Sequence, residues 1–504
     1  MSLEVERTVE YQPRNAHIEA VQTNTIKHTA INGTNFTKSS DFIEFRLNND
    51  GTFIDPTKTR LNCKFTPVTS GGTTPYAVFT SPSIWSAFSR MEIRQGGNIL
   101  EHCVDLNRMF SCLSKVYSSE LQARSGGSLT DLYQATAYEI TNAAAMGKRA
   151  TDVSTTPSAW FTETISVPIS LSNLIGPSAT QALPLALMKE PLYVRFYITN
   201  NVEEVLYSHN GSSSDLNGYG TGDFTLSDVS LEMCHIRYDS ETMNKIKEGM
   251  PNELVWDGLQ VISATNQIGY SNLERVILPN TSYSDVKNVI INQWYPVLSS
   301  SSATMGCSPL NGTYQAQLYL DGHPVRTRPV GSTESSAVVN SNAELSESVL
   351  SLNRPFSLLD DAKTQIAISY RQSVATLAGG VPITRYNFTN NNAGGGGGAV
   401  GSQVETYEIT SSPVPSTTLF MDGIYPLYHA SQVYFGYVGF DLQTNGDPSR
   451  ARKGVDCRGK QMVYEARQNN SISAGTAPCI CQAILNVGVK YVLDRQSGVL
   501  RTEY

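Results

Sequence analysis

Hydrophobic and polar residues alternate at period two in most of the apolar segments of this chain. Such alternation predicts β-strands that bury one face and expose the other. Turn residues separate the segments, as at Gly96-Gly97-Asn98 and Asn217-Gly218. The predicted strands of the first half are 42–47, 61–65, 91–93, 161–165, 192–198 and 224–238; those of the second half are 273–278, 286–294, 315–320, 366–370, 433–442, 462–466 and 480–494.

Helical periodicity is confined to a few short segments. Apolar residues at i, i+3, i+4 and i+7 predict a helix over 106–117, and a similar apolar face predicts another over 343–352. A further short helix is expected over 171–175, where Gly176-Pro177 would stop it. The polar segment 239–249 predicts a short helix that ends at a glycine.

The two halves of the chain follow the same plan. Each has early strands, a helix in a long crossover, and late strands, so we expect an all-β protein with short crossover helices. We divide the chain into an N-terminal arm (1–37), a first β-sandwich domain (38–245) and a second β-sandwich domain (246–504). The span 371–412 contains five consecutive glycines and is too long for an ordinary connection, which predicts a large loop excursion.

Composition supports strands and polar loops. Hydrophobic residues make up 40% of the chain and charged residues only 16%, and Tyr (25) and Phe (16) outnumber Trp (4). The net charge is −8, whereas binding to nucleic acid requires a basic surface. The densest basic cluster comprises Arg450, Arg452, Lys453, Arg458 and Lys460 and is interrupted by Asp456, so we interpret it as a solvated loop. No direct nucleic-acid binding is expected.

The eight cysteines do not form a disulfide framework, which is typical of a chain that folds in a reducing compartment. Cys479 and Cys481 would share one face of a predicted strand. With Cys457 they are too few for a zinc site, which commonly takes about four ligands. We expect them in the core, and we expect neither a metal nor a cofactor. The cysteines are Cys63, Cys103, Cys112, Cys234, Cys307, Cys457, Cys479 and Cys481.

No motif predicts catalysis. Nucleotide-binding, hydrolase and metalloprotease signatures are missing from the sequence. Asp360-Asp361 suits a turn or cap as well as an acid pair, and His235 is interpreted as a hydrogen-bonded sheet residue. We therefore assign no catalytic residue and do not expect an enzyme. None of the histidines forms an obvious pair with a carboxylate in the sequence; they are His17, His28, His102, His209, His235, His323 and His429.

Sequence signals for export are also weak. The first fifteen residues have no apolar core for a signal peptide, and no stretch approaches the roughly 18 apolar residues of a membrane helix. Sequons at Asn32, Asn280 and Asn387 are expected by chance in a chain rich in Asn, Ser and Thr. We expect a protein made inside a host cell and not secreted through a signal peptide.

Several segments, in order and spacing, resemble the double jelly-roll major capsid proteins of adenoviruses, tectiviruses, virophages and Polinton-like viruses. In the first half they are Ser83–Glu101, with its "FSR" before a strand and hairpin, the helix at 106–117, and Ser166–Gly176. In the second half they are Leu273–Asn280, Leu318–Gly322, the helix at 343–352, Tyr437–Leu442 and Lys490–Asp494.

The resemblance implies two tandem jelly rolls and a structural coat function. Three copies of two rolls would form a pseudo-hexagonal trimer that tiles an icosahedral virion shell around a double-stranded DNA genome. The expected partners are further copies of the chain and vertex and minor capsid proteins, and an internal membrane is possible. The span 371–412 would be a tower, a loop that projects outward from the shell.

Two other functions remain open at this point. A vertex or minor capsid protein could share the fold. A carbohydrate-binding β-sandwich protein could too, because fold does not determine function. The latter would need an aromatic platform, and the dispersed Trp85, Trp160, Trp256 and Trp294 do not suggest one.

Overall fold

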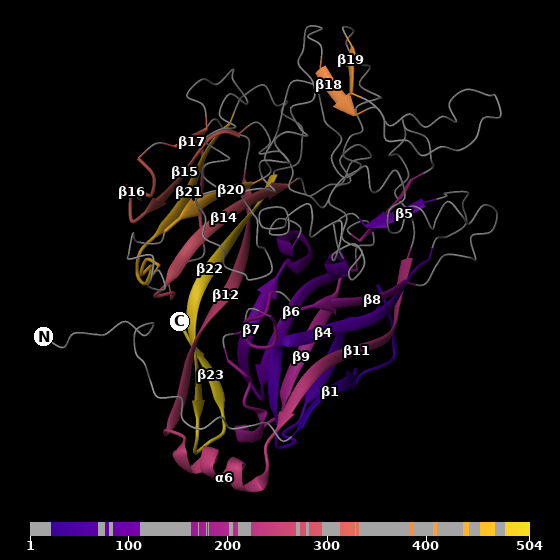
Figure 1. Ribbon diagram of the computed structural model, residues 1–504. Coiled ribbons are helices and arrows are strands. Elements are labelled where there is room, and N and C mark those ends of the chain that lie inside the picture. Colours follow the sequence, from indigo (N-terminus) through magenta and orange to yellow (C-terminus); the bar gives the residue numbers. More distant parts are fainter. Residues whose placement is uncertain are drawn as a thin grey trace, which may run out of the picture.

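The structure is a computed structural model. Figure 1 shows two β-sandwiches side by side, joined at one end by helix α6 (Ser240–Gly249). Within the described residues, no helix combines the length and the apolar character needed to cross a membrane. The described ranges are 22–68, 76–79, 84–110, 163–169, 171–177, 179, 181–200, 205–209, 223–268, 273–278, 282–294, 313–327, 329–331, 383–386, 407–410, 437–442, 454–468 and 479–504.

The first sandwich has two antiparallel sheets whose apolar faces enclose a core. Its largest fully buried side chains include Phe45, Phe65, Phe196 and Phe224. The first sheet has the order β1 (Gln22–Thr29), β11 (Asp223–Arg237), β4 (Phe53–Val68) and β8 (Glu163–Pro168), and β2 (Asn35–Thr37) also pairs with β11; the second has the order β3 (Phe42–Leu47), β9 (Leu192–Ile198), β6 (Phe88–Gln95) and β7 (Asn98–Val104).

The second sandwich is built in the same way, and Tyr464, Tyr491 and Phe440 are its largest fully buried side chains. Its first sheet has the order β12 (Glu253–Ile268), β22 (Cys479–Asp494), β14 (Val286–Trp294) and β20 (Tyr437–Asp441), and β23 (Leu500–Glu503) also pairs with β22; its second has the order β13 (Leu273–Ile277), β21 (Met462–Gln468), β15 (Thr313–Leu320) and β16 (His323–Pro324), and β17 (Val330–Gly331) also pairs with β15.

The two sandwiches share one topology. Eight strands of each sandwich, taken in chain order, form a sheet of order 1-8-3-6 and a sheet of order 2-7-4-5. In the first sandwich these strands are β1, β3, β4, β6, β7, β8, β9 and β11; in the second they are β12, β13, β14, β15, β16, β20, β21 and β22.

Two hairpins show how local residues set this topology. Between β6 and β7, Gly96 adopts φ 54°, and between β15 and β16, Asp321 and Gly322 adopt φ 53° and 80°. Positive φ at these turn positions gives the strands a twist that matches the sheet, and glycine adopts it without a steric cost. The turn predicted at Gly96-Gly97 is confirmed, and a second turn lies at Asp321-Gly322.

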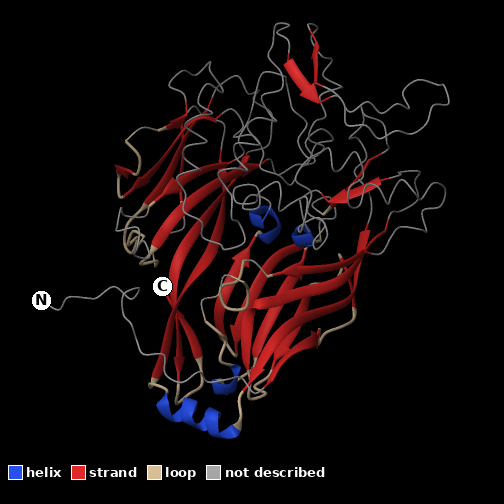
Figure 2. Ribbon diagram, in the orientation of Figure 1, coloured by secondary structure: helices blue, strands red, loops and turns tan. Residues whose placement is uncertain are grey.

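Short elements complete the described fold. The short polar helix predicted over 239–249 is confirmed as α6. Asp239 caps it by accepting a hydrogen bond from the Thr242 N–H at 2.6 Å. Residues 106–110 are helical, and the rest of the helix predicted over 106–117 lies outside the described residues. Figure 2 shows how few helices accompany the strands. The other elements are η1 (Ile84–Ala87), η4 (Leu185–Leu187), the pair β5 (Tyr76–Phe79) and β10 (Leu206–His209), and the pair β18 (Ile383–Tyr386) and β19 (Tyr407–Thr410).

Two expectations from the sequence are wrong. Residues 22–29 and 35–37 are not part of an extended arm, because β1 and β2 pair with β11. Almost all of β1 is exposed at a sheet edge, so backbone pairing holds it without an apolar face, and no alternation marks it in the sequence. Residues 1–21 of the expected arm lie outside the described residues.

The second error is the short helix expected over 171–175, where the structure has turns and bends. The Ser172 hydroxyl oxygen accepts hydrogen bonds from the N–H groups of Leu174 (3.2 Å) and Ile175 (3.0 Å). These local side-chain bonds replace the backbone bonds that a helix would require. The predicted helix at 343–352 and strand at 366–370 lie outside the described residues.

Candidate assembly surfaces

The two sandwiches meet along a polar contact, which we call the seam. Strand β7 is an edge strand of the first sandwich and runs beside β12, an edge strand of the second (Figure 1). The Leu100 carbonyl accepts hydrogen bonds from the Gln260 side-chain amide (2.6 Å) and the Thr502 hydroxyl (2.9 Å). The Val104 carbonyl accepts one from the Ser263 hydroxyl (2.5 Å).

Side chains thus bind the free edge of β7, and no backbone ladder joins the two sheets. A polar side chain must meet a particular carbonyl, so this arrangement fixes the position of one sandwich against the other. It also covers an edge that would otherwise be open to pairing with another chain. Each such bond contributes about 0.5–1.5 kcal/mol, and a buried polar group left without a partner costs about 1–3 kcal/mol.

Gln95 of the first sandwich binds residues of the second sandwich near the end of the chain. Its side chain is only 1% exposed. Its amide donates to the Gly498 carbonyl (3.2 Å) and its carbonyl oxygen accepts from the Leu500 N–H (2.6 Å). Gly498 adopts φ +64°, and a Cβ at this position would lie 2.8 Å from the backbone nitrogen of Lys189. The β22–β23 turn can therefore approach the first sandwich only with glycine at this position.

Glu101 is a fully buried carboxylate in the seam. It accepts hydrogen bonds from the Ser172 hydroxyl, from the Asn173 N–H (3.0 Å) and from the Tyr491 hydroxyl of the second sandwich. Burial raises the pKa of Glu101, although these hydrogen bonds oppose the effect. Burial and the charge of Glu101 raise the pKa of Tyr491 well above its ordinary value. The phenol therefore stays protonated and donates a hydrogen bond to the carboxylate.

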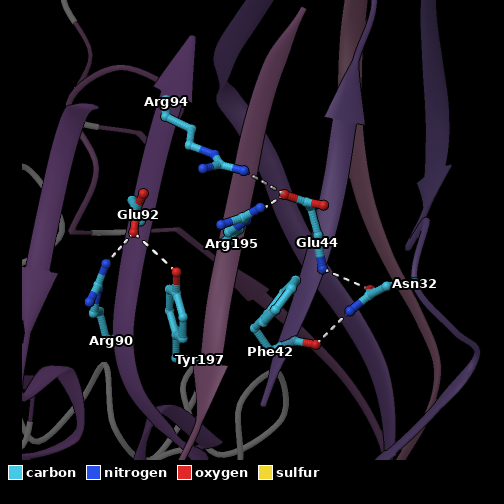
Figure 3. A network of polar contacts seen from close by, with 8 residues as sticks. All are labelled: Asn32, Phe42, Glu44, Arg90, Glu92, Arg94, Arg195 and Tyr197. Atoms are coloured by element: carbon cyan, nitrogen blue, oxygen red, sulfur yellow. Dashed lines mark hydrogen bonds and ion pairs between the residues drawn. The ribbon is translucent and has the colours of Figure 1, made fainter. Parts of the chain in front are cut away.

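The outer face of the second sheet of the first sandwich carries a charged network (Figure 3). Glu44 on β3 accepts from Arg195 on β9 and, at 3.4 Å, from Arg94 on β6. Glu92 on β6 pairs with Arg90 and accepts from the Tyr197 hydroxyl at 3.2 Å. Core residues alternate with these positions, so the network covers the side of the sheet that faces away from the core.

Aromatic rings hold the arginines of this network in place. The Cζ atom of Arg90 lies 4.5 Å from the ring centroid of Tyr197, and that of Arg195 lies 4.8 Å from the ring centroid of Phe42. Glu92 is only 4% exposed. Burial alone would raise the pKa of Glu92, but the hydrogen bond and charge of Arg90 hold it below its ordinary value. The outer face is charged, yet its carboxylates are already paired.

Asn32 shows what one predicted sequon does. Its side-chain amide donates to the Phe42 carbonyl (2.7 Å), and its side-chain oxygen accepts from the Glu44 N–H (3.0 Å) (Figure 3). The side chain therefore fixes the entry to β3. Asn280 and Asn387 lie outside the described residues.

A histidine cluster links the edge strand β1 to the first sheet. The Nε2 atoms of His28 and His235 are 2.9 Å apart, and the Nδ1 atom of His235 lies 2.7 Å from the Thr52 hydroxyl and 3.2 Å from Asp50. His235 is buried and hydrogen-bonded, as expected. No local spacing in the sequence could reveal this pair, because residues far apart in the chain meet here.

The described cysteines are structural. Cys63, Cys103, Cys234, Cys457 and Cys481 are free and buried, and burial raises the pKa of the Cys63 thiol to about 12. A thiol with so high a pKa remains protonated and is a poor nucleophile and a poor metal ligand. No group of three or more potential metal-binding residues occurs among the described residues. Cys481 lies in the core as predicted, whereas nothing is described of Cys112, Cys307 or the side chain of Cys479.

The other candidates from the sequence do not come together. Trp85 and Trp256 are buried in different sandwiches, and Arg458 pairs with Asp456 at 2.8 Å. Asp360-Asp361, Trp160 and the glycine run at 394–398 lie outside the described residues. The seam could not be predicted from the sequence, because its donors are ordinary Gln, Ser and Thr residues on strands.

No protein-family model and no curated protein matches the sequence. Solved structures do match the fold. A chain in the 3.5 Å cryo-EM structure of the Sputnik virophage aligns with a TM-score of 0.54 and 11% identity, covering 100% of this chain and 92% of that chain. A chain of the quasi-atomic PBCV-1 virus capsid aligns with a TM-score of 0.50 and 11% identity, covering 96% of both chains.

The chain has the double jelly-roll fold. Its repeated 1-8-3-6 and 2-7-4-5 sheets are two jelly rolls, and the alignments extend over nearly the whole chain. The predicted fold class, an all-β chain with two tandem jelly-roll sandwiches, is confirmed. At 11% identity the likeness is one of fold, so the double jelly roll alone does not establish function.

Proposed function

We propose that this chain is a major capsid protein that forms trimers and tiles an icosahedral virion shell. The observation that carries the proposal is the fold match to a chain of the PBCV-1 virus capsid, which covers 96% of both chains. The chain of the Sputnik virophage structure has the same fold. A coat subunit acts through its surfaces, and we assign it no enzymatic activity.

The seam supports this proposal physically. A shell subunit must present its outer surfaces at fixed angles, so its two jelly rolls must not move against each other. Buried Glu101 and Gln95 connect the two rolls through hydrogen bonds that leave little freedom of position. Two rolls of equal topology in one rigid chain give six similar units in a trimer, which is the pseudo-hexagonal outline that we propose.

We propose an orientation in the shell that is based on the two ends of the molecule. The pair β18–β19 lies within the span 371–412, at the end of the molecule opposite α6 (Figure 1). We place this end on the outside of the shell, with 371–412 as the tower, and α6 on the inside. The net charge of −8 favours a coat that leaves its genome to other components. Vertex and minor capsid proteins would be its further partners, and the virion its location.

The mass of the purified protein in solution tests this function. One chain has a mass of 55.0 kDa. Light scattering behind a sizing column should show a stable species near three times that mass. A monomer at every concentration tested would count against a coat function, because trimers are the proposed building unit of the shell.

A further inference from the structure

The seam joins unlike strands of the two jelly rolls. Strand β7 is the fifth of the eight strands in the first roll, and β12 is the first of the eight in the second roll. Both are edge strands of their sheets. The contact is therefore head-to-tail, and it leaves two corresponding edges unused within the chain. These are β16, the fifth strand of the second roll, and β1, the first strand of the first roll.

The two unused edges lie on opposite flanks of the molecule, with the seam between them (Figure 1). Neither β1 nor β16 has a second partner strand among the described residues. A contact between unlike surfaces on opposite flanks can repeat from one copy to the next, and such contacts form a closed ring when the rotation between copies divides the circle. The geometry thus suits a ring of alternating first and second rolls.

The side chains of β1 match the chemistry of the seam. In the seam, β12 donates hydrogen bonds from Gln260, Ser263 and Thr265. Strand β1 carries the same kinds of group at Gln22, Thr23, Asn24, Thr25 and Thr29, all exposed. None of these five side chains bonds to a described residue, whereas the seam side chains all find partners in the first roll.

The edge that would receive β1 is short and open. Both residues of β16, His323 and Pro324, are exposed. Proline has no N–H group, so this edge offers mainly carbonyl acceptors and resists ordinary strand pairing. Side-chain donors on a facing strand suit such an edge, as they suit the Leu100 and Val104 carbonyls of β7.

We propose that β1 of one copy docks against the β16 edge of the next copy and so repeats the seam between chains. This inference rests on the proposed trimer and names the surface that makes it. The polar side chains Gln22 to Thr25 bind carbonyls of the neighbouring chain near His323, and Ile26, which is 37% exposed, loses contact with water in the same step.

The first test places charge on β1. The double variant Thr23→Arg, Thr25→Arg puts two bulky cations on the exposed face of β1. On dilution, the trimer of this variant should begin to dissociate at a protein concentration at least tenfold higher than that at which the parent trimer dissociates. Light scattering measures both concentrations. The matched control is Asn244→Arg, Glu248→Gln, which adds the same charge to exposed positions of α6 and should remain a trimer.

The outcomes separate the two proposals. If the parent is a trimer and the β1 variant forms an equally stable trimer, the inference is overturned and the coat function is left intact. A monomeric parent overturns both. Circular dichroism and the unfolding midpoint show whether the β1 variant folds like the parent protein.

A cross-link tests the contact without disrupting it. The variant Thr25→Cys, His323→Cys places one thiol on each of the two edges, and a disulfide requires Cβ atoms about 3.5–4.5 Å apart. Mild oxidation of the trimer should give covalent dimers and trimers that a reducing agent separates. Each single-cysteine variant should give far fewer. Equal yields from the double and single variants overturn the proposed pairing.

Discussion

The two jelly rolls have the same strand order, but the outer faces of their second sheets carry different charged residues. In the first roll, Arg195 lies between Glu44 and Glu92 on the neighbouring strands. At the corresponding place in the second roll, Glu465 lies between Arg275 and Gln317. The sign of the central charge is reversed, yet the sheets pair alike.

Exposure differs as well. Arg195 has a side-chain exposure of 18%, whereas Arg275 has 66%. The outer face of β13 also exposes Leu273 (43%) and Ile277 (60%). The comparison teaches that the buried alternation sets the topology, because both rolls keep it. The two rolls keep the same strand order although the chemistry of their outer faces differs.

The largest effect on stability is expected from changes in the cores of the two rolls. Phe196 in the first roll and Phe440 in the second are both fully buried. Replacing either with alanine should lower the free energy of unfolding by about 3–5 kcal/mol, because a large cavity is left. Since the seam couples the rolls, urea unfolding followed by circular dichroism and by tryptophan fluorescence should show coincident transitions for both variants. Separate transitions for the two rolls would show that the seam does not couple them.

The second prediction concerns the seam glycine. Gly498→Ala should lower the free energy of unfolding by at least about 2 kcal/mol, since positive φ costs about 1–2 kcal/mol in a residue with a Cβ and the new atom also overlaps Lys189. Gly459→Ala is the matched control. Gly459 has φ +71° and open space around it, so only the backbone cost of about 1–2 kcal/mol applies. Equal urea midpoints for the two variants would contradict a tight approach at Gly498.

The third prediction tests the outer faces directly. Arg195→Met removes a charged partner from Glu44, which is 8% exposed, and should lower the free energy of unfolding by about 1.5–3 kcal/mol. Arg275→Met removes a partner that is itself 66% exposed. Glu465 is only 5% exposed but keeps Arg467 at 3.9 Å, so the cost should be smaller, about 1 kcal/mol. Chemical denaturation of both variants measures the difference. If Arg275→Met lowers the free energy of unfolding more than Arg195→Met does, the ion pairs of the first roll are not the more stabilising ones, and the comparison is wrong.

The fourth prediction concerns pH and the edge strand of the first roll. Burial, and for His28 also the charge of His235, holds the pKa values of His28 and His235 below the ordinary 6.5, while Asp50 opposes this. The unfolded chain therefore binds more protons below pH 6.5, and stability should fall as the pH drops from 6.5 toward the lowered values. Urea midpoints from pH 7.5 to 5.5 should fall more steeply for the parent than for His235→Gln. Parallel slopes would exclude a contribution from this cluster.

The sequence predicts the core strands well because their physics is local. The predicted ranges 42–47, 192–198 and 286–294 coincide with β3, β9 and β14. Apolar residues alternate in β3 and β9, whereas β14 has the consecutive apolar residues Val289, Ile290 and Ile291 and is buried on both faces. Strand β1 was missed because an exposed edge strand has no apolar face to display. The bend at Ser172 was missed because a hydroxyl that caps two N–H groups cannot be distinguished from a helical serine by spacing alone.

The assembly surfaces could not be predicted in the same way. The seam depends on β7 and β12 lying side by side, and 159 residues separate Ser263 from Val104. Likewise, His28 and His235 are 207 residues apart. Such contacts depend on the relative placement of sheets, which hydrophobic periodicity does not encode. The same limit applies to the unused edges at β1 and β16, which only the strand order reveals.

Electron microscopy of the purified protein tests the central claim most directly. If two rolls of one topology form each third of a ring, averaged images should show a particle with three-fold symmetry and six similar lobes in a hexagonal outline. A particle of one chain with two lobes, or an assembly whose lobes do not form a six-membered ring, would contradict the account.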